Sequence, residues 1–291
     1  MKPIHATILE GADNGIFSIR ILERPYFSTE FHFHTECQIT YILESEGRRI
    51  VGDSVDFFNS GELTFLGSDI PHVWHNDIQS LPKKAHNTGA KSLALFFHPD
   101  KLVHLLSELV DVQKLSLLFK IAQRGMVFFG ETKEGLKKLL VKMTAQKSLA
   151  QLITMLEIFE LLTTTKEYSL LASTGYKNTY QAKDSDRMDK VFKHIFCNFK
   201  SDIKLEEMAS IANMNQQAFC RYFKSRTQKT LVEFVNNIRI SHACKLISDG
   251  DYSITALAYE CGFQSLSNFN RFFKEVKGLT PREYRKQVTV L

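Results

Sequence analysis

The first hundred residues contain short hydrophobic runs and alternating segments, which are the patterns of β-strands. Gly, Asp, Asn or Pro residues bound these runs, so we expect turns between them. Many short strands of this kind are typical of a small barrel or sandwich, and we predict a β-barrel over about residues 1–98. The segments with the strand pattern are residues 31–34, 38–43, 49–51, 63–66 and 93–97.

After Pro99 the hydrophobic residues recur at the spacing of amphipathic helices. We therefore predict helices over about residues 99–172, which either pack behind the barrel or pair with a second chain. The two hydrophobic stripes consist of Leu102, Leu105, Leu106 and Leu109, and of Leu149, Leu152, Ile153, Leu156 and the polar Glu160.

A polar stretch at residues 173–185 lacks hydrophobic periodicity and predicts a linker between two domains. Residues 186–291 have a helical pattern throughout, and this part of the chain contains an internal repeat. Residues 208–213 resemble residues 257–262 at an offset of 49, and residues 219–224 resemble residues 269–274 at an offset of 50.

Each copy of the repeat has the residues that a helix-turn-helix unit needs. A small residue lies where two helices would cross, and four residues later comes a residue that tolerates positive φ in the turn. These pairs are Ala209 with Asn213 and Ala258 with Gly262. The helix that follows would bury its Phe residues and expose a polar face. That face carries Gln217 and Arg221 in the first copy, and Ser267, Asn268 and Arg271 in the second.

A helix with such a face fits the major groove of DNA, where Arg can bind a guanine edge and Gln or Asn an adenine edge. Between the two copies, the pattern predicts one helix over residues 231–248, with a length of ~27 Å. This length is near the ~34 Å between successive major-groove faces. We therefore predict that one chain binds one duplex with both helices. A duplicated helical bundle with no DNA partner is the alternative.

Positive charge is concentrated in the same part of the chain. Residues 1–185 hold 20 Lys and Arg against 21 Asp and Glu, whereas residues 186–291 hold 17 against 11. This separation favours a polyanion as the partner of the helical part. A tail that binds RNA generically is a further alternative, but the tail has no RNA-type aromatic platform and no low-complexity run.

The chain has 291 residues, enough for two domains, and its 44% hydrophobic and 24% charged residues are typical of a globular, soluble protein. No apolar run approaches the ~20 residues of a membrane-spanning helix, and the first residues lack the pattern of a secretory signal. The five cysteines stand singly, which argues against a disulfide framework and a zinc finger. We expect a cytoplasmic protein without membrane contact.

The second copy of the repeat carries a specific motif, formed by residues 262–265, 269–274 and 278–285. With this motif, about residues 186–286 resemble the DNA-binding domain of AraC/XylS-family transcription regulators. The resemblance implies base-reading positions at Gln217, Cys220 and Arg221, and at Leu266, Ser267, Asn268 and Arg271. Lys224, Lys274 and Arg282 are candidates for phosphate contacts, which position a protein without reading sequence.

The first domain has the residues of two further motifs. His32-x-His34 with Gln38, followed by Gly61, Gly67 and Pro71-His72, resembles the two cupin motifs, which are also expected at the front of many AraC-family regulators. Metal-dependent cupins have Glu where this chain has Gln38, a weaker ligand, and regulator cupins commonly bind organic effectors without metal. A metal-dependent cupin enzyme that carries a helical tail is the alternative function.

From this resemblance and from the preference of ligands for aromatic clefts at barrel mouths, we expect a small-molecule effector site and no metal or cofactor. The candidate effector residues are His34, Tyr41, His72 and Trp74. Arg20 and Arg24 either pair with an anionic or sugar-like effector or belong to the solvated surface.

The sequence therefore predicts an α+β protein with two domains. A cupin-like effector-binding and dimerisation domain spans residues 1–172, a linker spans 173–185, and an all-α double helix-turn-helix domain spans 186–291. The expected function is regulation of transcription at promoter DNA, without catalysis. The resemblance implies a homodimer that uses the helices between Pro99 and Lys166, for which a lid on the barrel is the alternative. RNA polymerase is a further candidate partner.

Overall fold

The computed structural model describes residues 15–27, 31–76, 89–177, 185–250 and 252–289. The chain divides into two compact units, one formed mainly by residues 2–178 and the other mainly by residues 179–291. Most of the predicted linker, residues 178–184, lies outside the described residues. Among the described helices, none is long and apolar enough to cross a membrane.

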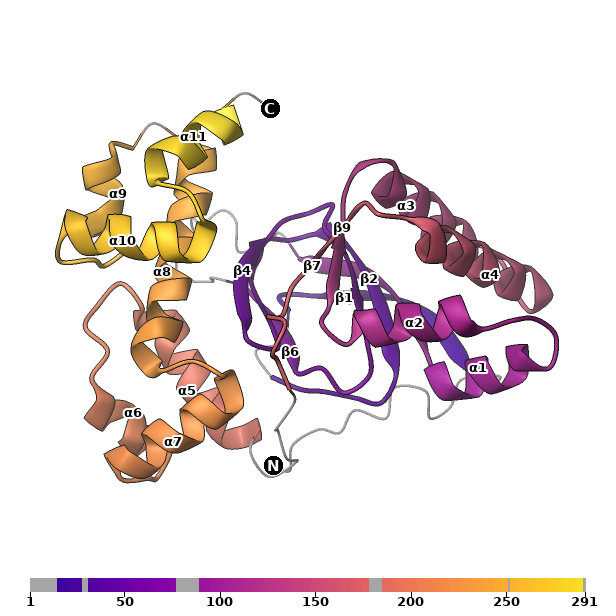
Figure 1. Cartoon of the computed structure of the whole chain (residues 1–291), viewed down its shortest axis with the longest axis horizontal. Coiled ribbons are helices and arrows are strands. Elements are labelled where there is room, and N and C mark those ends of the chain that lie inside the picture. Colours follow the sequence, from indigo (N-terminus) through magenta and orange to yellow (C-terminus); the bar gives the residue numbers. More distant parts are fainter. Residues whose placement is uncertain (1–14, 28–30, 77–88, 178–184, 251, 290–291) are drawn as a thin grey trace. The chain divides into compact units, whose positions relative to one another are not determined.

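The first unit contains two β-sheets (Figure 1). The larger sheet is antiparallel and has the strand order β1 (Phe17–Arg24), β7 (Ala90–Phe97), β2 (Cys37–Glu44), β5 (Leu63–Leu66), β8 (Met126–Phe128) and β9 (Tyr168–Leu170). The smaller sheet has the order β4 (Ser54–Phe58), β3 (Gly47–Val51) and β6 (His72–His75). The described strands do not close into a barrel, so the expected closed barrel was wrong in that respect.

Four of the five predicted strand segments lie within strands, namely β2, β3, β5 and β7. The fifth, residues 31–34, forms no strand of its own. His32 instead makes an isolated antiparallel bridge with His72 on β6. The bridge nevertheless brings His32 to the edge of the smaller sheet.

The two faces of β2 belong to different cores, because successive side chains of a strand point to opposite sides. Ile39 and Tyr41 face the main core, which the larger sheet forms together with helices. Ile42 faces the other way and packs against residues of the smaller sheet, among them Val51 and Trp74. The helices over the main core are α1 (Pro99–Ser107), α2 (Gln113–Ala122), α3 (Gly130–Thr144) and α4 (Leu149–Thr164).

Helix α4 buries a face that the predicted stripe does not include. Its buried residues are Thr154, Met155, Ile158, Phe159 and Leu162. Of the predicted stripe, Leu149 is 68% exposed, Ile153 50% and Leu156 37%. The helix is apolar on nearly all sides, so periodicity alone could not identify which face the fold buries. An apolar stripe of α4 is therefore left uncovered within the described part of the chain.

The second unit is all-α and confirms the predicted repeat. Its helices are α5 (Ser185–Asn198), α6 (Leu205–Ile211), α7 (Gln216–Thr227), α8 (Leu231–Asp249), α9 (Ile254–Glu260), α10 (Leu266–Lys277) and α11 (Pro281–Thr289). Helices α6 and α7 form one pair and α9 and α10 the other, and α8 runs between the two pairs (Figure 1).

Equivalent hydrogen bonds begin the equivalent helices of the two pairs. The side chain of Asn215 accepts a hydrogen bond from the backbone N–H of Ala218 at the start of α7, and Ser265 accepts one from Asn268 at the start of α10. Helix α8 begins with a capping box in which Thr230 and Glu233 bond each other's backbone N–H. Thr280 and Glu283 repeat this arrangement at the start of α11. Such caps stabilise a helix by about 1 kcal/mol each.

The turns between paired helices require a left-handed backbone, as the sequence predicts. Asn213 has φ 53° and Gly262 has φ +85°. A Cβ atom at Gly262 would lie 2.4 Å from the backbone carbonyl oxygen of Lys200, a distance that real contacts do not reach. Gly278 ends α10 with φ +72°, and a Cβ atom placed there would have no other atom within 4 Å.

We expect Gly262→Ala to destabilise the helical unit more than Gly278→Ala. The left-handed backbone costs each Ala about 1–2 kcal/mol, and the clash with the Lys200 carbonyl adds about 1–3 kcal/mol at residue 262 only. Calorimetric melting of the full chain measures both variants against the parent protein. Equal melting temperatures for the two variants would contradict the close approach of the backbone at Gly262.

Candidate nucleic-acid interface and candidate effector pocket

Helices α7 and α10 hold their outward faces in place by burying pairs of Phe residues. The rings of Phe219 and Phe223 lie 5.5 Å apart, and those of Phe269 and Phe273 lie 5.6 Å apart. All four side chains are buried. A helix anchored along one side by two aromatic rings presents its opposite side in a fixed orientation.

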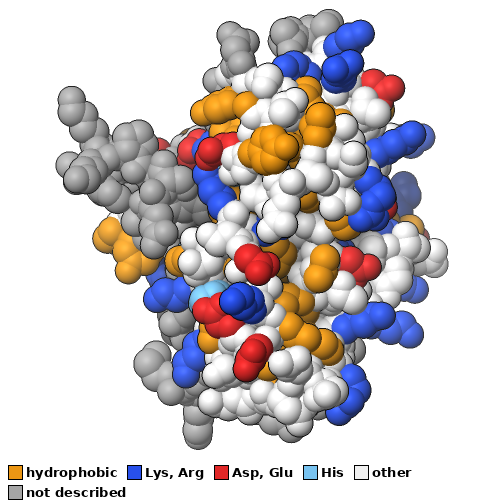
Figure 2. Space-filling view, turned by 90° about the vertical axis from the view of Figure 1, so that its left-hand side faces the viewer, with side chains coloured by type: hydrophobic (Ala, Val, Ile, Leu, Met, Phe, Trp, Pro, Cys, Tyr) orange, Lys and Arg blue, Asp and Glu red, His pale blue; other side chains and the backbone are white. Residues whose placement is uncertain are grey.

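The structure places nine of the ten predicted DNA-binding residues at exposed positions. These are Gln217, Cys220, Arg221 and Lys224 on α7, Ser267, Asn268, Arg271 and Lys274 on α10, and Arg282 on α11. Leu266 differs, because it is half-buried and packs against the core of the second pair. Figure 2 shows Lys and Arg side chains along one edge of the face it displays, with hydrophobic side chains between them.

The two outward arginines have different surroundings. The Arg271 guanidinium forms an ion pair with Glu275, at 2.9 Å, and lies 4.1 Å from the ring centre of Phe272. The residue at the matching position of α7, four after Arg221, is Ser225. Arg271 is therefore both oriented and partly neutralised before any contact with a ligand.

Arg239 of helix α8 contacts both the loop that precedes the first helix pair and the turn of the second pair. Arg239 donates hydrogen bonds to the backbone oxygens of Phe199 and Ser201, which lie between α5 and α6, at 2.7 and 2.8 Å. Its guanidinium also lies over the ring of Phe263, in the turn before α10, at 5.6 Å. An ion pair between Lys200 and Glu260 joins the same two regions. The 19 residues of α8 span about 28 Å, as the sequence predicts.

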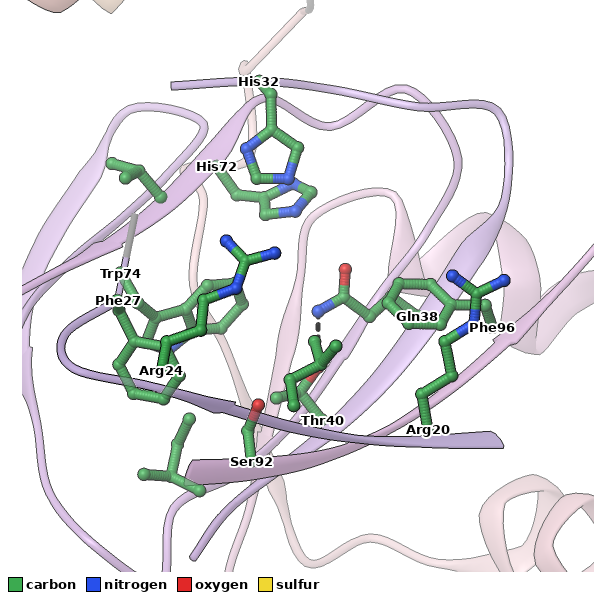
Figure 3. A pocket seen from close by; sticks show the side chains of 13 residues that line it. Arg20, Arg24, Phe27, His32, Gln38, Thr40, His72, Trp74, Ser92 and Phe96 are labelled. Atoms are coloured by element: carbon green, nitrogen blue, oxygen red, sulfur yellow. Dashed lines mark hydrogen bonds between the residues drawn. The ribbon is translucent and has the colours of Figure 1, made fainter. Parts of the chain in front are cut away.

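The first unit contains a cavity of about 240 Å³, which side chains of both sheets line (Figure 3). Its walls are apolar where Trp74, Phe96 and Phe27 lie, and polar where Gln38 and Thr40 of β2 lie. The remaining lining residues are Arg20, Leu22, Arg24, His32, Ile42, His72, Val73 and Ser92. In Figure 3 the Arg24 guanidinium points toward the rings of His32 and His72.

Only part of the predicted effector set lines this cavity. His72 and Trp74 line it. His34 lies behind it and contacts the side chain of the lining residue Gln38, with 3.1 Å between His34 Nε2 and Gln38 Oε1. Tyr41 lies on the opposite face of β2, in the main core, so the structure does not bring it into the cavity. The alternation of β2 places Gln38 and Thr40 there instead.

Burial controls the charge of the histidines at the end of the cavity. Burial and the neighbouring His32 lower the pKa of His34 to about 4. Burial is also the largest reason why the pKa of His72 lies well below its ordinary value. Both rings are therefore neutral near pH 7.

A helix-turn-helix domain model matches residues 208–287. The chain is 23% identical over 262 residues to the uncharacterized HTH-type transcriptional regulator YdeC of Bacillus subtilis, covering 88% of this chain and 85% of that protein. It is 24% identical over 275 residues to the melibiose operon regulatory protein of Escherichia coli K12, covering 90% and 85%.

Among solved structures, the chain is similar to fatty-acid-bound ToxT of Vibrio cholerae, with 14% identity, a TM-score of 0.37, and coverage of 95% of this chain and 97% of that chain. Regulators thus match the chain along most of its length, and the matched domain model coincides with the repeat whose two turns, two capped helices and exposed basic faces are described above. With this helix-turn-helix domain and these relatives, the chain is similar to DNA-binding transcription regulators of the AraC/XylS type.

Proposed function

We propose that the chain recognises promoter DNA by inserting α7 and α10 into successive major grooves of one duplex. The observation that carries this proposal is that one continuous helix, α8, runs between two helix pairs that each have an exposed polar face. Arg239 of α8 is hydrogen-bonded to the loop before α6, and its guanidinium lies over the ring of Phe263 in the turn before α10. The length of α8, about 28 Å, is close to the rise of one DNA turn, about 34 Å.

The proposal assigns two kinds of role to the exposed residues. Gln217, Arg221, Asn268 and Arg271 have side chains that hydrogen-bond base edges, and we propose that they read sequence, with Cys220, Leu266 and Ser267 beside them. Exposed charges also lie toward the ends of α7 and α10, on Lys224 and Lys274, and at the start of α11, on Arg282. We propose that these three residues bind phosphates. Leu266, being half-buried, would offer at most an apolar edge to a thymine methyl group.

We expect Arg271→Ala to weaken binding to the cognate site by about 1–3 kcal/mol and to relax the preference at one base position. Lys274→Ala should weaken binding to all sequences alike, because a phosphate contact does not depend on the base. Fluorescence anisotropy on cognate and scrambled duplexes measures both effects. Lys137→Ala, an exposed lysine of α3, is the control and should change neither affinity. Equal losses on both duplexes for Arg271→Ala would contradict base reading.

We further propose that the cavity of the first unit binds a small organic anion and that its occupancy changes which DNA sites the protein binds. Two guanidinium groups, of Arg20 and Arg24, stand at a cavity whose other walls combine aromatic and aliphatic side chains with a few polar ones. Arginine binds carboxylates in a bidentate geometry, and the apolar walls favour a hydrocarbon body.

Trp74 is the single tryptophan of the chain and lines the cavity, so its fluorescence reports on occupancy. We expect short aliphatic carboxylates to change this fluorescence and the corresponding alcohols to leave it unchanged. Arg24→Gln and Arg20→Gln should each weaken carboxylate binding by about tenfold or more, the loss of one charged hydrogen bond. Lys91→Gln, on β7 outside the cavity lining, is the control. Carboxylate binding that survives both arginine substitutions would contradict the proposed ligand class.

We propose that the chain forms a homodimer through α4. Leu149, Ile153 and Leu156 form an exposed stripe at i, i+4 and i+7, which is the spacing that a second helix can cover. These residues do not have to cover the core of the first unit, because the opposite face of α4 already packs on that core.

We expect the double variant Leu149→Glu/Ile153→Glu to be monomeric at concentrations where the parent chain is dimeric, because four carboxylates would meet across the interface. Sedimentation equilibrium measures the dissociation constant. Lys120→Glu, at an exposed position of α2, adds negative charge away from the stripe and should leave the dimer intact. A parent chain that sediments as a monomer would overturn the proposal.

The expectations about catalysis, place of action and domain bounds also remain proposals. Because the relatives are regulators, we propose that the chain has no catalytic activity and that it acts in the cytoplasm, where promoter DNA and the candidate partner RNA polymerase are found. We retain 1–172, 173–185 and 186–291 as the proposed bounds of the sensor domain, linker and DNA-binding domain.

A further inference from the structure

Three imidazole rings meet at one end of the cavity. The ring centres of His32 and His72 lie 4.4 Å apart, those of His34 and His72 5.1 Å, and those of His32 and His34 5.9 Å. One nitrogen of each ring lies within 4.8 Å of the others. His34 and His72 are almost completely buried, whereas His32 is half-buried and borders the cavity.

The backbone fixes which nitrogen of the two buried rings carries the proton. Nδ1 of His34 lies 2.9 Å from the carbonyl oxygen of Glu36, and Nδ1 of His72 lies 2.8 Å from that of Ile70. A carbonyl oxygen only accepts, so Nδ1 donates in both rings, which leaves Nε2 as the nitrogen that can bind a metal. Metal-binding histidines are oriented in the same way. Nε2 of His72 has no hydrogen-bond partner among the described residues.

The side chain of Gln38 adds a fourth lone pair. Its amide nitrogen donates to the hydroxyl of Thr40, which turns its Oε1 toward Nε2 of His34 at 3.1 Å. The two groups lie at hydrogen-bond distance from each other. A bound cation would replace that contact and bring both groups to one centre, and Gln38, like His34, is buried. Glu36 reinforces the arrangement, with a carboxylate oxygen 3.6 Å from Nδ1 of His34.

We infer that His32, His34, His72 and the amide oxygen of Gln38 form a binding site for a divalent transition metal ion. Three neutral imidazoles and one oxygen are a donor set that suits Zn²⁺, Fe²⁺, Co²⁺ or Ni²⁺ and not Mg²⁺ or Ca²⁺. This inference replaces the sequence-based expectation of no metal, which rested on Gln38 in place of Glu and on the metal-free effector binding that is common in regulator cupins.

Metal binding would draw the rings together. Nitrogens that lie 2.0–2.1 Å from a tetrahedral zinc ion are about 3.3 Å from each other, so ligand nitrogens that now lie within 4.8 Å of one another would approach by up to about 1.5 Å. His32 lies outside the named strands and is joined to β6 by the isolated bridge to His72. The site opens on the cavity through His32 and His72, where the guanidinium of Arg24 favours an anion as a further ligand.

Titration of the full-length, tag-free and chelator-treated protein with Co²⁺ tests the inference. We expect visible absorption bands of nitrogen-bound Co²⁺, a stoichiometry of one ion per chain by elemental analysis, and displacement of Co²⁺ by Zn²⁺. The paramagnetic ion should also quench Trp74, whose ring centre lies 5.5 Å from that of His72. His34→Gln and His32→Asn should each weaken binding by more than about tenfold.

Two further variants sharpen the test. Gln38→Glu should bind Co²⁺ more tightly, since a carboxylate is the better ligand, and an affinity equal to that of the parent chain would remove Gln38 from the site. His104→Gln, in α1, changes an exposed histidine outside the cluster and should bind like the parent chain. Circular dichroism establishes that each variant is folded. A folded parent chain that binds no Co²⁺, or cluster variants that bind it as the parent does, would overturn the metal site. DNA affinity is measured separately and does not depend on this outcome.

Discussion

The hydrogen bonds and ring contact of Arg239 are the interaction on which the geometry of the DNA-binding unit depends. A single helix does not by itself fix the direction in which two helix pairs face, because each pair could rotate about its own contact with the helix. Arg239 removes that freedom by bonding the backbone between α5 and α6 and stacking on Phe263 beyond α9. The Lys200–Glu260 ion pair and the close approach at Gly262 act between the same regions.

The helical unit could be predicted almost completely from the sequence, because its determinants are local. The positive-φ residues Asn213 and Gly262, the paired Phe residues and the capping pair Thr230 with Glu233 lie within a few positions of the structure they produce. Arg239 could not be predicted in this way, since its partners are backbone atoms about 40 residues distant.

The first unit was harder to predict because its determinants are not local. The strand β2 was expected, but its two faces were not told apart, and Tyr41 was therefore assigned to the cavity that Gln38 and Thr40 line. Strand β1 carries Arg20 and Arg24 on the cavity side, and its charged residues hid its strand pattern. The stripe of α4 had the right residues, but the fold buries the other face.

The ion pair between Arg271 and Glu275 has a consequence for the proposed DNA contact of α10. To reach a base edge, the Arg271 guanidinium would have to exchange its contact with the carboxylate, and a base that offers two acceptors in the correct plane compensates best for that exchange. Helix α7 has Ser225 four residues after Arg221, so the proposed contact of Arg221 would require no such exchange.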